Sequence, residues 1–288
     1  MKRFEYFEPA SLLDAVALLS RYQGKANLLA GGTDLLVEIK EQIRAPDYVI
    51  SIQRIAGMDH LSFDAQSGLR IGALVTTRKL ELSPVVQKLY PGLLQAIREL
   101  GSIQVRNRAT LAGNICRASP SADTLPPLIA DGAAVRIHGE RGERSVLLEE
   151  FFTGPGKTVL APHELLVEIL LPAPPPRTGK SYIKHGRRKA MELATVGVAV
   201  CLTLEGAICR AVRICLGAVA PTPIRARNAE KVLYGQILNN NLIEKAADAA
   251  MSESRPISNL RGSADYRREM VRVLTRRSIE EAQRRAAA

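Results

Sequence analysis

In the first part of the chain, short apolar runs typical of strands alternate with stretches whose apolar residues have helical spacing. Residues 12–19 place their leucines and a valine on one helical face, after an S-x-x-D capping sequence that begins at Ser11. Residues 27–30 and 48–52 are apolar runs typical of buried strands, and residues 35–43 between them have helical spacing. A helix that joins two apolar strands predicts a small parallel unit.

From about residue 57 the pattern changes to short elements in mixed order. Thr76 and Thr77 can cap a short helix that ends near Pro84, and a longer helix is predicted over residues 92–100. Strands are predicted at residues 69–73, 134–138, 145–148 and 165–171. Such mixed order is typical of an α+β arrangement.

A proline-rich stretch separates this region from the last third of the chain. Four of the five residues 172–176 are proline, which removes backbone donors and favours extended structure. After it, strands are predicted at residues 181–184, 194–204 and 210–216, the last two joined as a hairpin by the Glu205-Gly206 turn. Helices are predicted at residues 228–234, 242–251 and 266–285.

Composition and cysteine usage limit the class of protein. Hydrophobic residues make up 46% of the 288, enough for a sizeable core. No apolar run is long enough to span a membrane, and the N-terminus does not resemble a signal peptide. The cysteines form no C-x-x-C pair and have no histidine at metal-ligand spacing: Cys116, Cys201, Cys209 and Cys215. We therefore expect reduced thiols, no metal site and a cytoplasmic location.

A net charge of +11 requires an explanation, and arginines crowd the C-terminal stretch from Arg261 to Arg285. A basic helix can bind nucleic acid through phosphate contacts. Tyr266 is the only aromatic residue in this stretch, however, and no nucleic-acid motif accompanies it. A solvated helix face, or a surface that meets acidic partner subunits, is the favoured interpretation, and we expect no nucleic-acid partner.

The first candidate site is the sequence LLAGGTDLL over residues 28–36. Gly31 and Gly32 stand between a predicted strand and a predicted helix, where consecutive N–H groups and the helix N-terminus can bind an anion such as a pyrophosphate. The alternative is a tight turn without a ligand.

The second candidate site is the segment from Thr110 to Asp123, TLAGNICRASPSAD. We predict an irregular segment here because small residues, hydroxyls, an amide and a carboxylate follow one another. Asn114 and Asp123 could supply orientation-specific hydrogen bonds to a polar ligand. The alternative is an ordinary polar loop.

Six segments in order resemble a known family. AGGTDLL and TLAGNICRASPSAD are similar to the paired flavin-binding segments of the medium subunit of the xanthine dehydrogenase and carbon monoxide dehydrogenase family of molybdenum hydroxylases. Further matches follow in the same order: FFTGPGKTVLAPHELL, SYIKHGRRKAMELATVGVAV, GAVAPTPIRARNAEKVL and RGSADYRREMVRVLTRR. The APTPIRA and TGPGK sequences resemble xanthine dehydrogenase-like members more than carbon monoxide dehydrogenase.

This resemblance implies an α+β fold with a bipartite FAD-binding domain of the vanillyl-alcohol oxidase and p-cresol methylhydroxylase type. A C-terminal α+β domain with an antiparallel sheet and helices would follow it. The implied division is residues 1–56 for the first FAD-binding subdomain, 57–172 for the second, 173–179 for a proline-rich linker and 180–288 for the C-terminal domain.

The resemblance also implies the residues that bind FAD. They are Leu29, Ala30, Gly31, Gly32, Thr33, Asp34 and Leu35 in the first segment, Thr110, Ala112, Gly113, Asn114, Ser119 and Asp123 in the second, and Leu165, Leu166 and Lys184 beyond them. The first segment would hold the pyrophosphate, the leucines would pack near the isoalloxazine ring, and Lys184 would lie near its polar edge. No catalytic side chain and no metal ligand are implied.

Three of these assignments have alternatives or departures. Lys184 lies in a basic run with Lys180, Arg188 and Lys189, so an exposed basic loop is equally consistent with the sequence. Leu165 and Leu166 could be simple strand core. Ala112 stands where the family often has a second glycine. The cysteine-rich loop that holds an iron–sulfur cluster in hydroxybenzoyl-CoA reductases is absent here.

By resemblance, the chain would be an electron-transfer subunit. Electrons would arrive singly from [2Fe-2S] centres in a small partner subunit, collect on FAD, and leave as a pair to NAD⁺, oxygen or another acceptor. A large molybdopterin-containing subunit would hydroxylate the substrate, with purines as the first expectation, and the assembly would be a dimer of heterotrimers. The alternatives are a stand-alone flavin-dependent oxidoreductase of the same fold and a basic nucleic-acid-binding module.

Overall fold

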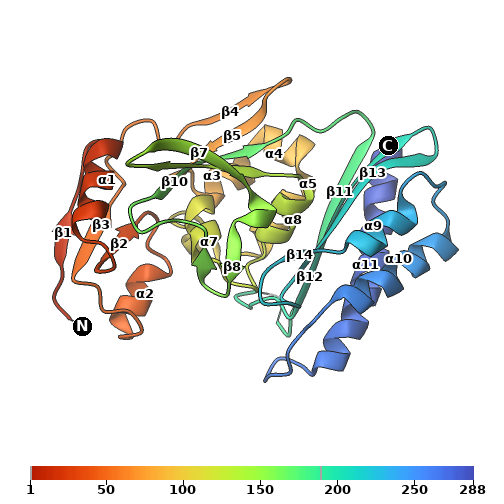
Figure 1. Cartoon of the computed structure of the whole chain (residues 1–288). Helices are drawn as coiled ribbons and strands as arrows, with labels where there is room; N and C mark the ends of the chain where they lie inside the picture. The colour runs from red at the N-terminus through yellow and green to blue at the C-terminus, as the bar shows by residue number, and fades with distance from the viewer. Residues whose placement is uncertain (1, 189) are drawn as a thin grey trace.

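A computed structural model describes residues 2–188 and 190–288 of the chain, so Lys189 of the basic run lies outside the described residues. Three sheets follow one another along the sequence, as Figure 1 shows from the red N-terminal end to the blue C-terminal end. Each sheet is built from one continuous stretch of the chain, and helices cover its faces. The predicted α+β class is confirmed.

The first sheet is the predicted parallel unit with one additional strand. Its order is β1-β3-β2 and all its pairs are parallel. The sheet and its helices comprise β1 (Glu5–Phe7), α1 (Leu12–Arg21), β2 (Ala26–Leu29), α2 (Leu35–Lys40) and β3 (Tyr48–Ser51). Ser11 caps α1 by accepting a hydrogen bond from the Asp14 N–H, as the sequence predicts. Helix α2 is shorter than predicted, because Gln42 takes a left-handed backbone conformation.

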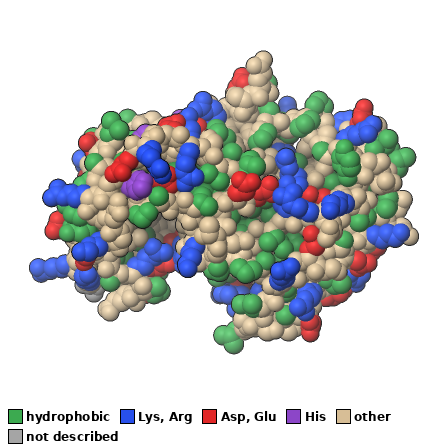
Figure 2. All heavy atoms as spheres, in the orientation of Figure 1, with side chains coloured by type: hydrophobic (Ala, Val, Ile, Leu, Met, Phe, Trp, Pro, Cys, Tyr) green, Lys and Arg blue, Asp and Glu red, His purple; other side chains and the backbone are tan. Residues whose placement is uncertain are grey.

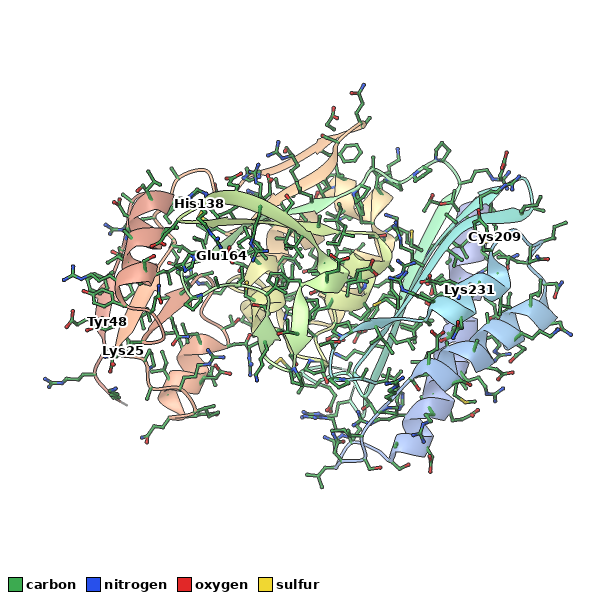
Figure 3. All side chains as sticks on the ribbon, viewed as in Figure 1. Lys25, Tyr48, His138, Glu164, Cys209 and Lys231 are labelled. Carbon is green, nitrogen blue, oxygen red and sulfur yellow. The ribbon has the colours of Figure 1, made fainter. Side chains whose placement is uncertain are left out.

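An aromatic stack closes the outer side of the first sheet. The rings of Tyr22 and Tyr48 stack with centroids 3.8 Å apart, and Phe7 packs on Tyr22 at 5.5 Å. Tyr48 is labelled in Figure 3 at the edge of the molecule. The stack joins the end of α1, through its C-cap residue Tyr22, to β1 and β3.

The second sheet is antiparallel and contains five strands in the order β4-β5-β10-β6-β7. Its strands are β4 (Leu61–Asp64), β5 (Gly68–Gly72), β6 (Ala134–Gly139), β7 (Gly142–Leu147) and β10 (Leu165–Leu171). The central strand β10 has the predicted bounds, and β5, β6 and β7 overlap their predicted positions. A small hairpin, β8 (Phe152–Gly154) with β9 (Lys157–Thr158), follows the 3₁₀ turn η1 (Leu148–Glu150).

Six helices connect the strands of this sheet: α3 (Thr77–Leu82), α4 (Pro84–Leu89), α5 (Pro91–Glu99), α6 (Ile103–Arg106), α7 (Leu111–Arg117) and α8 (Leu125–Ala130). The prediction of an irregular segment from Thr110 to Asp123 is wrong for its first half, which forms α7. The cause is a helix cap: the Thr110 hydroxyl accepts a hydrogen bond from the Gly113 N–H at 3.0 Å. Leu111 and Ile115, one turn apart, then anchor the helix in the core.

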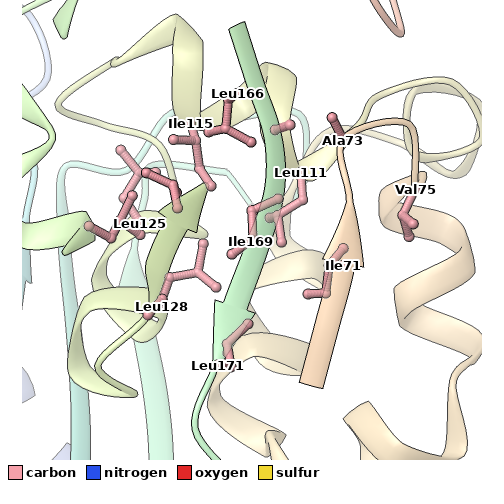
Figure 4. Close-up of a cluster of buried hydrophobic side chains, with 14 of the residues drawn as sticks. Ile71, Ala73, Val75, Leu111, Ile115, Leu125, Leu128, Leu166, Ile169 and Leu171 are labelled. Atoms are coloured by element: carbon pink, nitrogen blue, oxygen red, sulfur yellow. The ribbon is translucent and has the colours of Figure 1, made fainter. Parts of the chain in front are cut away.

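The main hydrophobic core lies between the second sheet and these helices. Figure 4 shows Leu111 and Ile115 of α7 beside Leu166 and Ile169 of β10, with Leu128 of α8 completing the cluster. All five side chains are buried. Helix α7, which carries the second candidate segment, therefore has a fixed position on the sheet.

The third sheet is the predicted antiparallel hairpin with a strand on each side, in the order β11-β12-β13-β14. Its elements are β11 (Thr178–His185), β12 (Val196–Glu205), β13 (Ile208–Gly217), β14 (Ile224–Arg225), α9 (Arg227–Leu233), α10 (Asn240–Glu253) and α11 (Ala264–Ala287). Strand β11 includes Thr178 and Gly179, the last two residues of the predicted linker. In Figure 1 this sheet stands between the middle of the molecule and helices α9–α11.

The C-terminal arginines are largely paired with acids. Arg272 contacts Glu269 at 2.5 Å, Arg276 contacts Glu244 at 3.5 Å, and Arg267 is buried. On the face shown in Figure 2, blue and red side chains are interspersed. This arrangement fits the prediction of a solvated, salt-bridged helix face. Within residues 2–188 and 190–288, no helix combines the length and hydrophobicity needed to cross a membrane.

Gly179 tests the packing of α11 on β11. A methyl group at this position would overlap the carbonyl oxygen of Ala282 in α11. We expect Gly179→Ala to lower the free energy of unfolding by about 2–4 kcal/mol, because backbone on both sides must move. Urea denaturation measures the change. Gly154→Ala is the control, since its methyl group would meet only the Lys157 side chain at 3.9 Å, and an equal loss in both variants would contradict the prediction.

Candidate functional site

The first candidate segment touches the backbone directly before the second. A methyl group on Gly31 would overlap the carbonyl oxygen of Arg108, which lies two residues before Thr110. Gly32 has a φ of 78°, in the left-handed region that glycine adopts without strain. Each glycine therefore has its own role: Gly31 allows close contact with residues 108–109, and Gly32 makes the turn into α2.

A cleft of about 420 Å³ opens at this contact. Its lining includes Ala30 and Gly31 of the first segment and Thr110 of the second. The other lining residues are Gln53, Arg54, Ile55, Ala56, Asp59, Leu74, Thr76, Asn107 and Arg108. Its size lies within the range of small-molecule sites, roughly 300–1,000 Å³. The structure thus brings Ala30, Gly31 and Thr110 to one cavity, although about eighty residues separate them in sequence.

Several residues position the cleft walls and were not singled out from the sequence. The Gln53 side-chain amide donates to the Ala30 carbonyl at 2.6 Å and so fixes the turn from outside. His60 contacts the buried carboxylate of Glu168 at 2.6 Å and holds residues 57–60 against the second sheet. The only sequence signal for Gln53 is that a polar residue follows directly after a buried strand.

An ion pair joins α2, which begins in the first segment, to α7, which lies within the second. Glu38 of α2 is mostly buried and contacts Arg117 of α7 at 2.7 Å and Arg44 at 2.6 Å. Asp34 occupies the N-cap position of α2, and no capping hydrogen bond from its side chain is present among the described residues. The Glu38–Arg117 pair holds the two helices in a constant relation beside the cleft.

Within the second segment, the polar residues fold back on the chain itself. The Thr124 hydroxyl donates to the side-chain oxygen of Asn114 at 2.6 Å, and the Ser121 N–H donates to the Ser119 hydroxyl at 3.4 Å. Ala112, the departure from the family pattern, is buried in the core. Its methyl group therefore packs away from solvent, on the inner face of α7.

Asp123 and Lys184 form a buried ion pair with a separation of 2.9 Å. The Tyr182 hydroxyl donates to the other Asp123 oxygen at 2.7 Å. Besides Asp123, the Lys184 ammonium donates to the carbonyl of Glu192 at 2.6 Å and of Glu99 at 3.3 Å. The alternative of an exposed basic loop is wrong for Lys184, whose side chain is only 4% exposed.

Burial dominates the electrostatics of this pair. It raises the pKa of the Asp123 carboxyl to about 6, even though Lys184 and the Tyr182 hydroxyl act in the opposite direction. All three ammonium protons of Lys184 have protein acceptors, so a ligand would share this cation with Asp123.

The remaining predicted residues lie around the cleft or beneath it. Leu165 and Leu166 are buried in β10 with 1% and 3% of their surface exposed, which favours the alternative of strand core. Leu29 and Leu35 belong to a small apolar cluster under the first sheet, and Thr33 is half-buried in the turn. The site residues thus form a group at the cleft and a second group around Asp123.

Metal and thiolate sites each place requirements on the possible metal ligands and the cysteines of the described residues. Within residues 2–188 and 190–288, no group of three or more His, Cys, Asp or Glu side chains is placed so that it could hold a metal ion. Burial raises the pKa of Cys201 to about 12 and of Cys209, labelled in Figure 3, to about 11. These thiols remain protonated at neutral pH.

Two family profiles match consecutive parts of the chain. The "FAD binding domain in molybdopterin dehydrogenase" matches residues 2–174, and the "CO dehydrogenase flavoprotein C-terminal domain" matches residues 181–282. Together they cover the three sheets and most of the terminal helix α11.

Curated relatives and solved structures match over nearly the whole length. The chain is 33% identical to a putative xanthine dehydrogenase FAD-binding subunit of Escherichia coli strain K12, covering 96% of this chain and 95% of that one. It is 36% identical to the carbon monoxide dehydrogenase medium chain of Hydrogenophaga pseudoflava over 99% of both. The two identities, 33% and 36%, are similar. They therefore do not decide whether the chain is more similar to xanthine dehydrogenase-like members than to carbon monoxide dehydrogenase.

Solved structures show the same fold. The structure of the Hydrogenophaga pseudoflava carbon monoxide dehydrogenase matches with a TM-score of 0.95, 37% identity and 98% coverage of both chains. Quinoline 2-oxidoreductase from Pseudomonas putida 86 matches with a TM-score of 0.93, 30% identity and 100% coverage of both chains. The expected bipartite fold with a C-terminal domain is therefore confirmed.

The Asp123–Lys184 pair gives a test of coupling and of pH dependence. We expect Asp123→Asn and Lys184→Met each to cost about 3–5 kcal/mol of unfolding free energy, because each leaves a buried polar partner unmatched. The double variant should lose less than the sum of the two. Urea denaturation of all four proteins gives the coupling, and strictly additive losses would exclude a coupled pair.

The pH dependence has a definite sign. Because the folded pKa of Asp123 is raised from 3.8 to about 6, the folded state binds more protons between these values, and the stability contributed by this group falls as the pH rises through about 6. Relative to Asp123→Asn, the wild-type chain should therefore lose stability between pH 4 and pH 6. Parallel profiles of the two proteins would contradict this assignment.

Proposed function

Because the chain belongs to the family of FAD-binding subunits of molybdopterin dehydrogenases, we propose that it is the electron-relaying FAD subunit of a multi-subunit molybdenum hydroxylase. The observation that carries the proposal is the single cleft formed by two segments that the sequence assigns to the cofactor. FAD, when bound, supplies the chemistry by accepting electrons singly and releasing them as a pair.

The residues around the cleft fit an FAD molecule. The Gly31–Gly32 turn exposes backbone without side chains, Arg108 supplies a cation, and the cavity has the volume of a small-molecule site. We propose that Ala30 to Leu35 bind the pyrophosphate half, with Leu29 supporting the turn from below. Thr110 would shape the opposite wall. Ala112, Gly113, Asn114 and Ser119, in α7 and just after it, would support the cofactor site from behind this wall.

Asp123 and Lys184 would orient the flavin end of the cofactor. Their buried, hydrogen-bonded geometry is fixed before a ligand arrives, which lowers the cost of ordering on binding. Leu165 and Leu166 would contribute through the core on which this part of the site rests. No side chain is assigned a covalent step, since the cofactor carries the chemistry.

The proposed roles of the parts of the chain follow their order in the sequence. Residues 1–56 and 57–172 would form the two FAD-binding subdomains, residues 173–179 the linker, and residues 180–288 the C-terminal domain. Electrons would come from a [2Fe-2S] small subunit in an assembly with a molybdopterin-containing large subunit, as a dimer of heterotrimers. NAD⁺ or oxygen would be the acceptor. A cytoplasmic location is proposed because the four cysteines form no disulfide with one another.

The other candidate functions receive less support. A stand-alone oxidoreductase of the same fold would need its own substrate-oxidising centre, and the matched relatives are named as subunits or medium chains. A nucleic-acid-binding module would need unpaired basic residues on α11, where Arg272 and Arg276 are instead paired with acids.

Gly31 tests the cofactor assignment. We expect Gly31→Ala to reduce FAD content per chain at least about tenfold, because its methyl group pushes the two segments of the cleft apart. Visible flavin absorbance of the purified chain, after incubation with FAD, measures the content. Gly154→Ala should keep its flavin, and full flavin content in Gly31→Ala would exclude the proposed cleft.

Partner dependence tests the relay role. The isolated chain with FAD should show no turnover of purines, other N-heterocycles or aldehydes, because the substrate-oxidising centre lies in another subunit. Co-purified iron–sulfur and molybdenum chains should restore substrate-dependent bleaching of the flavin absorbance. Turnover by the isolated chain would favour the stand-alone oxidoreductase instead.

A further inference from the structure

The charged residues of the cleft are not equivalent. Three of its lining residues carry charge: Arg54, Asp59 and Arg108. Arg54 already has a partner, since its guanidinium lies 3.3 Å from the Glu8 carboxylate. In the part of the chain that the structure describes, no carboxylate lies within ion-pair distance of the Arg108 guanidinium. Arg108 is thus the cation of the cleft whose charge is not neutralised.

The position of Arg108 is fixed by its backbone. Its N–H donates to the Val105 carbonyl at 3.0 Å, and its own carbonyl lies against Gly31. The side chain therefore starts beside the glycine turn, where the segments meet. It is exposed to solvent at the cleft, so it can reach a ligand without disturbing the core.

We propose that Arg108 binds the diphosphate of FAD and thereby makes the cleft selective for a dinucleotide over riboflavin. The inference rests on the proposed function and assigns to this residue the ionic part of cofactor recognition. A guanidinium can donate two parallel hydrogen bonds to phosphate oxygens. It also carries a full positive charge, which the backbone N–H groups of the glycine turn do not. Riboflavin, which has no phosphate, would gain nothing from this residue.

The test compares a substitution at this cleft arginine with one at an arginine outside the cleft. FAD and riboflavin are titrated into the full-length, flavin-free chain at low ionic strength, with flavin fluorescence as the readout. Arg108→Gln should raise the Kd for FAD roughly tenfold and leave the Kd for riboflavin within about twofold. Arg108→Lys should lie between, because it keeps the charge but not the planar pair of donors. Arg272→Gln on α11, which is paired with Glu269 and lies outside the cleft lining, is the control and should resemble wild type.

A second readout separates a charge effect from a change of shape. In wild type, adenosine diphosphate should displace FAD more effectively than adenosine does, and added salt should reduce this advantage. Arg108→Gln should reduce the advantage and its salt dependence, leaving the part that the Gly31–Gly32 turn supplies. The backbone contact with Gly31 uses only the carbonyl of residue 108, so both substitutions keep it.

The experiment distinguishes a failure of the Arg108 inference from a failure of the proposed function. If wild type binds FAD but Arg108→Gln and Arg272→Gln change its Kd equally, or riboflavin binding falls as much as FAD binding, the inference is overturned alone. If wild type binds no FAD at all, the proposed function fails and the inference fails with it.

Discussion

The candidate site depends on one steric constraint, the close approach of the Gly31 backbone to the carbonyl of Arg108. Only a residue without a Cβ allows two chain segments to touch in this way. The cleft lies beside this contact, with Thr110 on the opposite wall. The Glu38–Arg117 ion pair then keeps the helices behind the two segments at a constant separation.

The C-terminal sheet is joined to the middle of the molecule by buried charge as well as by apolar packing. Besides the Asp123–Lys184 pair, Lys180 contacts Asp131 at 2.9 Å, and its ammonium lies over the Tyr90 ring. Both lysines come from β11. Buried pairs add modestly to stability compared with apolar packing, but they penalise any arrangement that separates the partners. They favour one fixed orientation of β11 against the cofactor-binding part.

Elements with a strong apolar period were predictable from sequence, and single polar contacts were not. Strand β10 has the predicted bounds because seven mostly apolar residues end at a proline. Helix α7 was missed, since its small polar residues resemble a loop until Thr110 is recognised as a cap. The roles of Gln53 and Arg108 depend on contacts with residues 23 and 77 positions away, which no local pattern contains. Lys184 was ambiguous because burial, not residue type, decides its role.

The position of α11 has a consequence for synthesis of the chain. This helix covers β11 and β12, with Gly179 allowing backbone contact with Ala282 about a hundred residues later. The first two sheets are complete within the first 171 residues and can form early. The inner face of the third sheet, including Val198 and Val200, stays uncovered until the ribosome has made α11. During that interval the nascent chain exposes an apolar surface that a chaperone would recognise.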